Sequence, residues 1–173
     1  ISMDGTGGSS TGFGQSLGVF FRANASIITN GGGIAMIGQG GSGPGNYNAG
    51  ILTQETVAIN DTAMGDISFN GIGGSGVSIS GGVILFETTV TAVDGSISAI
   101  GRGGTGTGDF ANGIYMQDSA LDAGSGNITL DGTGGAGDVL NEGILSFTSS
   151  FNTTDGTIQM TGEATDVTGD FNQ

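Results

Sequence analysis

The sequence contains no cysteine, lysine, histidine or tryptophan, and only one proline in 173 residues. Without cysteine the fold has no disulfides, so its stability must come from packing. Without lysine a phosphate-binding P-loop is excluded, and without lysine or histidine the usual proton-accepting bases of polysaccharide lyases are missing. No apolar run approaches the roughly 18 residues of a membrane-spanning helix, so membrane insertion is not expected.

Positive charge is nearly absent as well. The basic side chains are Arg22 and Arg102, against 16 acidic residues, which gives a net charge of −14. A chain of this charge cannot neutralise a phosphate backbone, so nucleic acid is not expected as a partner. An anionic membrane surface is disfavoured by the same argument.

Glycine is the residue that the chain has in excess. Its 39 glycines lie far above the usual share of about 7%. A hydrophobic fraction of 35%, with Ile, Leu, Val and Phe recurring regularly, argues against disorder. The length is that of one domain, which we expect to span residues 1–173.

One phrase of the form Ile-x-apolar-x-Gly-x-Gly-Gly recurs along the chain, for example as ISMDGTGG at 1–8 and ITLDGTGG at 128–135. Its leading isoleucines follow one another in steps of 30 to 33 residues. They are Ile1, Ile34, Ile67, Ile97, Ile128 and Ile158, the last in a degenerate copy. A repeat of this length is typical of a solenoid whose coils stack on one another.

Each repeat holds two further apolar segments, such as GILT at 50–53 and TVAIN at 56–60. Alternation with a period of two and many β-branched residues predict strands, and no window favours a helix. The sequence therefore predicts an all-β fold, a parallel β-helix (β-solenoid). We expect about three strands and 30–33 residues per coil, with five full coils and a partial sixth. A right-handed coil is expected, since parallel crossovers usually have that hand.

Stacked coils would place equivalent residues in columns. The leading isoleucines form one predicted inward column, and Met3, Met36, Phe69, Ala99, Leu130 and Met160 form a second. The dipeptides Asp4-Gly5, Asn70-Gly71 and Asp131-Gly132 are predicted to supply left-handed residues at a corner of the coil.

Four segments match the dinucleotide-binding pattern G-x-G-x-x-G, at 38–43, 71–76, 101–106 and 132–137. A dinucleotide site requires a helix after the glycines to hold the pyrophosphate. No helix is predicted there, and the match recurs once per coil. We interpret these segments as coil corners and expect no cofactor.

Two further segments, GGTGTGD at 103–109 and GGAGD at 134–138, come close to the calcium-binding nonapeptide of β-rolls. Their aspartates are displaced by one residue from the required position. We interpret the acidic residues at turns as solvated surface groups. Weak calcium binding between coils or subunits is kept as an alternative, with candidate ligands Asp94, Asp109, Asp138 and Asp155.

The acidic residues do not suggest catalysis. Glycoside hydrolysis requires two converging carboxylates, whereas the acids of this chain lie mostly at turns and differ from coil to coil. A catalytic cluster would interrupt the repeat in consecutive coils, and no such interruption is visible. We expect no enzymatic activity and predict no catalytic residue.

The second strand of each coil is predicted to be apolar on both faces. Val19, Ile51, Val83, Ile114 and Ile144 are expected to point inward, because the opposite register would bury Arg22 and Gln54. Their neighbours then form an outward apolar stripe, which consists of Phe20, Leu52, Ile84, Phe86, Tyr115, Leu145 and Phe147. Such a stripe requires a cover. The cover is either another subunit or the loops at 9–18, 42–50, 75–82, 105–113 and 136–143.

The first and last repeats show no capping sequence, so Ile1, Met3, Ile158 and Met160 are expected at open ends of the solenoid. Stacking of another copy, or flanking repeats of a longer chain, would cover them. The predicted assembly interface combines these four residues with the apolar stripe.

The phrase GNITLDGTGG at 126–135 and its partner GILS at 143–146 resemble repeats of filamentous-haemagglutinin-like exoproteins, which are large bacterial adhesins of the two-partner secretion type. The resemblance covers residues 1 to about 160. It implies a right-handed parallel β-helix, display outside the cell or on its surface, and a role in fibre formation or attachment to surfaces or glycans.

These observations lead to one functional hypothesis and one alternative. The hypothesis is a non-enzymatic structural protein, a subunit or segment of an extracellular β-solenoid fibre that assembles with itself through coil stacking and the apolar stripe. The alternative is a passive stalk segment of a large secreted adhesin that binds surfaces or glycans.

Overall fold

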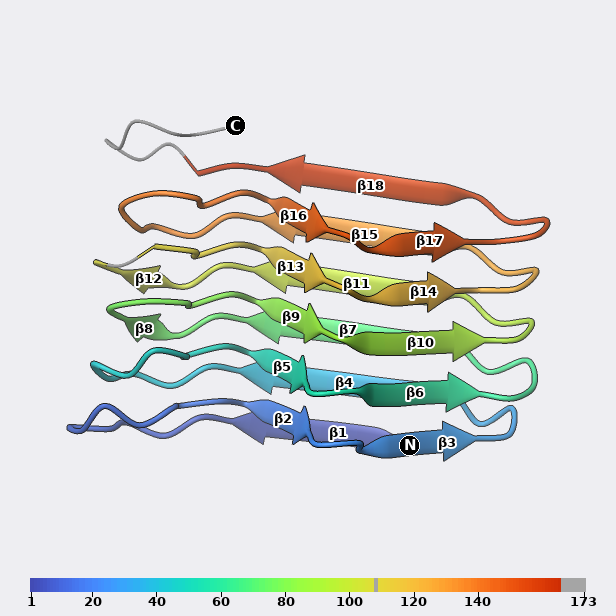
Figure 1. Ribbon diagram of the computed structural model, residues 1–173, viewed down its shortest axis with the longest axis horizontal. Coiled ribbons are helices and arrows are strands. Elements are labelled where there is room, and N and C mark those ends of the chain that lie inside the picture. Colours follow the sequence, from blue (N-terminus) through green and yellow to red (C-terminus); the bar gives the residue numbers. More distant parts are fainter. Residues whose placement is uncertain (108, 166–173) are drawn as a thin grey trace.

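The computed structural model describes residues 1–107 and 109–165, and in these residues the chain winds as a stack of coils (Figure 1). All of the named strand pairings are parallel, and the described residues contain no helix, so none that could cross a membrane. This confirms the predicted all-β parallel β-solenoid of about five turns. The right-handed coil stays a prediction.

Three sheets run the length of the stack, and each takes one strand from each coil. The first sheet consists of β1 (Ser2–Thr6), β4 (Ile34–Gln39), β7 (Ile67–Ile72), β11 (Ile97–Arg102), β15 (Ile128–Thr133) and β18 (Ile158–Glu163). The second consists of β2 (Val19–Arg22), β5 (Ile51–Gln54), β9 (Val83–Phe86), β13 (Ile114–Gln117) and β16 (Ile144–Phe147).

The third sheet consists of β3 (Ser26–Thr29), β6 (Val57–Asp61), β10 (Thr88–Ala92), β14 (Ala120–Asp122) and β17 (Ser150–Asn152). A small pair, β8 (Ser75–Gly76) and β12 (Thr105–Gly106), lies in the loops on the left of Figure 1 and was not predicted. Because each strand pairs with its equivalent one repeat away, the pattern of three strands per coil is confirmed.

The core lies between the three sheets and is built from columns of equivalent side chains. Ile67 pairs in register with Ile34 on one side and Ile97 on the other. In the inner coils both predicted columns are at most 2% exposed; the residues are Ile34, Ile67, Ile97, Ile128, Met36, Phe69, Ala99 and Leu130. Both inward columns are therefore confirmed there. A coil buries its apolar face only against its neighbours.

The glycines of the repeated phrase have a different role from the predicted one. Asn70 and Gly71 lie inside the extended strand β7, and Gly71 is not in a left-handed conformation. The predicted left-handed corner at Gly5, Gly71 and Gly132 is wrong. A Cβ atom on Gly71 would lie 2.1 Å from the carbonyl oxygen of Gly82, just before β9. Glycine is needed because the backbones of the first and second sheets meet there.

One buried charge stabilises the corner between the third and first sheets. Asp61, at the end of β6, is fully buried and shares its column with Thr29 and Ala92. Its carboxylate accepts hydrogen bonds from donors in two coils, namely the N–H groups of Gly31, Gly33, Ala63 and Gly65 and the hydroxyl of Thr29. This set of donors satisfies the charge and ties the first two coils together.

The same hydrogen bonds lower the pKa of Asp61 well below its ordinary value. The hydroxyl of Thr29 has the largest effect, burial acts in the opposite direction, and the N–H groups of Ala63, Gly65 and Gly31 add to the lowering. Asp61 is therefore ionised in the folded state even in acid, and it binds a proton more readily when the chain is unfolded.

We predict that Asp61→Asn lowers the thermal midpoint at pH 7, because the amide brings its own donor into a site lined by donors. The stabilisation by the carboxylate is present above the unfolded-state pKa of about 3.9 and is lost as the pH falls towards the lower folded-state pKa. The difference between wild type and variant, followed by circular dichroism from pH 7 to pH 2, should thus shrink below about pH 4. A constant difference would contradict this account.

Candidate functional site

The two open edges of the first sheet are the first candidate site. Strand β1 pairs only with β4 and strand β18 only with β15 among the described strands. At these edges Ile1 is 50% exposed and Ile158 and Met160 are each 43% exposed, whereas their equivalents in the inner coils are buried. Met3 is half-buried against the core. The four predicted end residues therefore lie where the next coil would stack.

The outer face of the second sheet is the second candidate. Its side chains alternate as predicted: Ile51, Val83 and Ile114 belong to the main core, while Leu52, Ile84 and Tyr115 form a separate cluster outside it. Leu52 and Ile84 are completely buried and Tyr115 is 9% exposed. The cover comes from residues of the chain itself, namely Leu17, Tyr47, Ala49 and Ile79 in the loops before the strands.

The prediction that Leu52 and Ile84 belong to an assembly interface is therefore wrong. The loops fold over these side chains and leave no surface there for another subunit. Of the other stripe residues, Phe147 is 49% exposed, and Phe20, Phe86 and Leu145 are half-buried. The loops thus cover the apolar stripe completely over the middle coils, but they leave it partly exposed towards the corner that leads into the third sheet.

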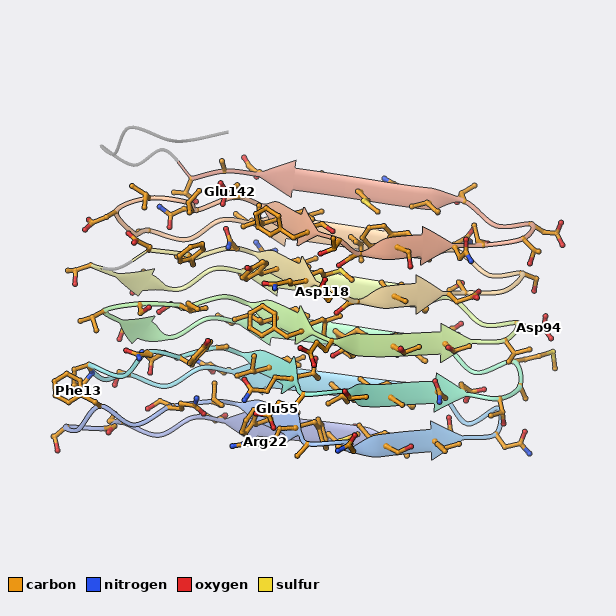
Figure 2. The ribbon with its side chains drawn as sticks, in the orientation of Figure 1. Phe13, Arg22, Glu55, Asp94, Asp118 and Glu142 are labelled. Carbon is orange, nitrogen blue, oxygen red and sulfur yellow. The ribbon has the colours of Figure 1, made fainter. Side chains whose placement is uncertain are left out.

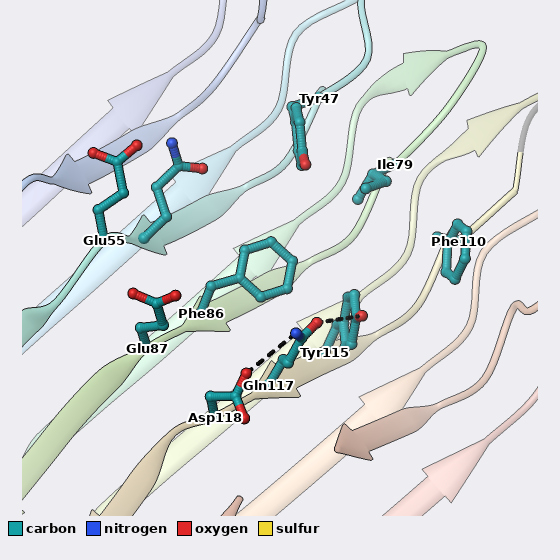
Figure 3. A pocket seen from close by; sticks show the side chains of 10 residues that line it. Tyr47, Glu55, Ile79, Phe86, Glu87, Phe110, Tyr115, Gln117 and Asp118 are labelled. Atoms are coloured by element: carbon teal, nitrogen blue, oxygen red, sulfur yellow. Dashed lines mark hydrogen bonds between the residues drawn. The ribbon is translucent and has the colours of Figure 1, made fainter. Parts of the chain in front are cut away.

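At this corner the loops leave an open groove of about 400 Å³ (Figure 3). Its aromatic lining comes from the loops and the second sheet and consists of Tyr47, Phe86, Phe110 and Tyr115. Ile79, two amides (Gln54 and Gln117) and three carboxylates (Glu55, Glu87 and Asp118) complete the lining. Its lining contains no basic side chain, so the groove combines apolar surface with negative charge only.

The aromatic rings of the groove pack around Tyr115. The Phe86 ring meets it edge-on with the ring centres 5.0 Å apart, and the Phe110 ring lies nearly parallel to it at 6.3 Å. Phe147 also approaches edge-on, at 6.1 Å. These are favourable geometries for aromatic pairs. The rings therefore form a supported wall rather than independent surface side chains.

The three carboxylates form a column along the solenoid axis. Glu55, Glu87 and Asp118 follow directly after the last residues of β5, β9 and β13, and each has a left-handed backbone, with φ of 63°, 48° and 51°. This conformation is uncommon for glutamate. It turns the chain from the second sheet into the third, so the column is placed at this corner by the turn itself.

Hydroxyl groups one residue further on support this turn. Thr88, Ser119 and Ser149 each donate a hydrogen bond of 2.8 to 3.0 Å to the carbonyl two residues earlier. Between coils, the N–H of Thr88 donates to Ser119 Oγ at 3.1 Å, and the N–H of Ser119 donates to Ser149 Oγ at 3.2 Å. The hydroxyl column thus satisfies backbone groups at the turn and fixes the spacing of the acids.

The surroundings of Tyr115 and Asp118 shift the pKa values of these two groups. Burial raises the pKa of Tyr115, and electrostatic interaction with Tyr47 and Asp118 acts in the same direction, so the phenol stays protonated. It donates a hydrogen bond to Gln117 Oε1 at 3.1 Å. Hydrogen bonds from Thr148 and then Gln117 lower the pKa of Asp118, which stays ionised at neutral pH.

The four predicted calcium ligands are not brought together. Asp94 lies at the corner on the right of Figure 2, and Asp155 lies in the equivalent turn two coils away. Asp109 and Asp138 lie in the loops at the opposite end of the coils. The Asp94 carboxylate accepts a hydrogen bond from Ser125 at 2.9 Å. No group of three or more acidic side chains suited to a metal ion occurs within residues 1–107 and 109–165.

Comparison of the chain with protein families, with curated proteins and with solved structures found no match. The groove and its acidic column were not predicted from the sequence. One signal was present, since Gln-Glu at 54–55, Phe-Glu at 86–87 and Gln-Asp at 117–118 follow the second strand at the same point of the repeat. The left-handed turn that places these acids in one column contains no glycine at the left-handed position, so the sequence did not indicate it.

We predict that Ser119→Ala destabilises the fold by about 1 to 3 kcal/mol, because it leaves the buried N–H of Thr88 without a partner. Urea unfolding followed by circular dichroism measures the effect. Ser98→Ala is the matched control, since the Ser98 hydroxyl makes no hydrogen bond to any residue in the described ranges. Equal stability of the two variants would show that the hydroxyl column does not support the turn.

Proposed function

We propose that this chain is a non-enzymatic structural segment of an extracellular β-solenoid that is extended by end-to-end stacking of coils. The observation that carries the proposal is the exposure of core positions at the two edges. The Ile158 column is at most 1% exposed from Ile34 to Ile128 and 43% exposed at Ile158 itself. A further coil on each edge would bury these side chains and pair the backbone groups of β1 and β18 that have no strand partner among the described residues.

The stacking contact would be of one kind throughout. The β18 edge of one unit would receive the β1 edge of the next, with Ile158 and Met160 opposite Ile1 and Met3 in the register that the inner coils use. Such a head-to-tail contact uses two different surfaces and does not close on itself, so it generates a fibre. The same edges would equally accept flanking repeats of a longer chain.

The arrangement of the carboxylates supports a structural rather than a catalytic role. Glycoside hydrolysis needs two carboxylates on opposite sides of the bond that is cleaved. In the groove, Glu55, Glu87 and Asp118 lie in one column on the same side (Figure 3). With no histidine or lysine in the chain, a separate base is also missing.

The alternative function is a passive stalk within a large secreted adhesin. The resemblance of the repeated phrase to filamentous-haemagglutinin-like exoproteins supports it, and with it display outside the cell. In a stalk the two edges are covered by coils of the same chain, so isolated copies of the 173 residues need not associate in long arrays. Association in solution therefore separates the two functions.

We predict that the purified chain forms elongated assemblies in a concentration-dependent manner and that Met160→Glu weakens this association by about tenfold or more, since burying an unpaired charge costs several kcal/mol. Sedimentation velocity and electron microscopy measure it. Gln159→Glu is the control, because Gln159 precedes Met160 in β18, points to the other side of the strand and has the uncharged Thr129 as its register partner. Monomers at high concentration, or equal effects of both variants, would contradict end-to-end stacking.

A further inference from the structure

The groove at the corner of the second sheet is unlike the rest of the surface. It has a half-buried aromatic lining, with Tyr47, Phe86 and Phe110 partly open to solvent around the buried ring of Tyr115. Aromatic faces that stay open in a polar surface are suited to an apolar chain or to a cation placed over the ring. The lining therefore favours a ligand with an apolar part.

The negative charge of the groove rim favours a ligand that carries positive charge. Glu55, Glu87 and Asp118 stand one coil apart, about 4.8 Å from strand to strand. Like charges at this spacing repel one another. The two outer carboxylates have partners, Arg22 for Glu55 and Thr148 with Gln117 for Asp118. The central Glu87 carboxylate makes no hydrogen bond or ion pair within residues 1–107 and 109–165.

The chain itself shows that this column accepts an organic cation. The guanidinium of Arg22, from the first coil, lies against Glu55 with Nη2 3.2 Å from Oε1 and 3.3 Å from Oε2. Arg22 is the last residue of β2 and lies beside Glu55, which belongs to the groove lining (Figure 2). No basic residue is available to do the same at Glu87, because the other arginine, Arg102, belongs to the first sheet.

We infer that the groove binds a linear polyamine, with one ammonium group at Glu87 and a second at the neighbouring Asp118 or Glu55. Three or four methylene groups separate two ammonium groups by about 5 to 6 Å at ordinary bond lengths, which matches the spacing of the acid column. The methylene chain would then lie along Phe86 and Tyr115. The amide oxygens of Gln54 and Gln117 are further acceptors for ammonium protons.

The same features exclude other ligands of similar size. An acidic sugar or a phosphate would meet three carboxylates and no positive partner except the paired Arg22. A neutral sugar could stack on the rings but would leave the repulsion between the acids unrelieved. The inference is independent of the proposed structural function, since the groove lies on the side of the stack and not at its ends.

Intrinsic tyrosine fluorescence gives a direct test. The chain has two tyrosines and no tryptophan, and both Tyr47 and Tyr115 line the groove. Spermidine is titrated into the full chain at low ionic strength, with 1,4-butanediol, magnesium chloride at matched ionic strength and maltotriose as separate arms. We expect a saturable change in tyrosine emission with spermidine alone.

Two variants locate the site. Glu87→Gln keeps the size of the side chain and removes the charge, and it should weaken spermidine binding by about threefold or more, as expected for an exposed charge pair. Asp131→Asn is the control, because it makes the same change on an exposed position of β15, in the first sheet. A thermal melt of each variant establishes that it is folded.

The outcomes are distinct. Saturable binding of spermidine that Glu87→Gln weakens and Asp131→Asn leaves unchanged supports the inference. Equal loss in both variants, or an equal response to magnesium, would mean that only the overall charge of −14 is sensed and would overturn it. A response to maltotriose without one to spermidine would also overturn it, in favour of a neutral sugar.

Discussion

The structure depends on one interaction, the parallel pairing of each strand with its equivalent in the next coil. A single coil has three short strands and cannot bury its own apolar face, so it is stable only between two neighbours. Register then has to be exact over the whole stack, because a slip of one residue would turn Ile67 and Phe69 outward and their polar neighbours inward. Among the described strands β1 and β18 each pair on one side only, and the proposed function is placed at these two edges.

The same pairing makes functional side chains occur in columns. A residue at one point of the repeat is placed about 4.8 Å from its equivalents above and below, whether or not these side chains attract one another. For Ile or Thr such a column is favourable, but for Glu55, Glu87 and Asp118 it brings like charges together on a turn that glutamate seldom adopts. Arg22 forms an ion pair with Glu55, and Thr148 donates a hydrogen bond to Asp118. The central Glu87 has no such partner among the described residues, and this is the reason for the proposed ligand.

The regular part of the fold could be predicted from the sequence because the same pattern of apolar residues and glycines recurs in each coil. The common spacing of three apolar segments per repeat predicted the three strands of each coil, and the isoleucine phrase predicted both inward columns that the inner coils show. What the repeat could not show was the path of the irregular loops, so the cover over Leu52 and Ile84 was left open and their assignment to an interface was wrong. Asp61 was also not recognised, because three of its donors, in Thr29, Gly31 and Gly33, come from the preceding coil. Gly71 was misread because close backbone approach and a left-handed turn both require glycine.

The absence of cysteine allows the stacking to be tested directly. Ser98 and Thr129 are register partners on β11 and β15, at a separation of about 4.8 Å that a disulfide can span, whereas Gln159 on β18 lies one coil further from Ser98. Under mild oxidation the variant with Ser98→Cys and Thr129→Cys should form an intramolecular disulfide, and the variant with Ser98→Cys and Gln159→Cys should not, as measured by mass spectrometry. Equal disulfide formation in both, or in neither, would contradict the stacked register.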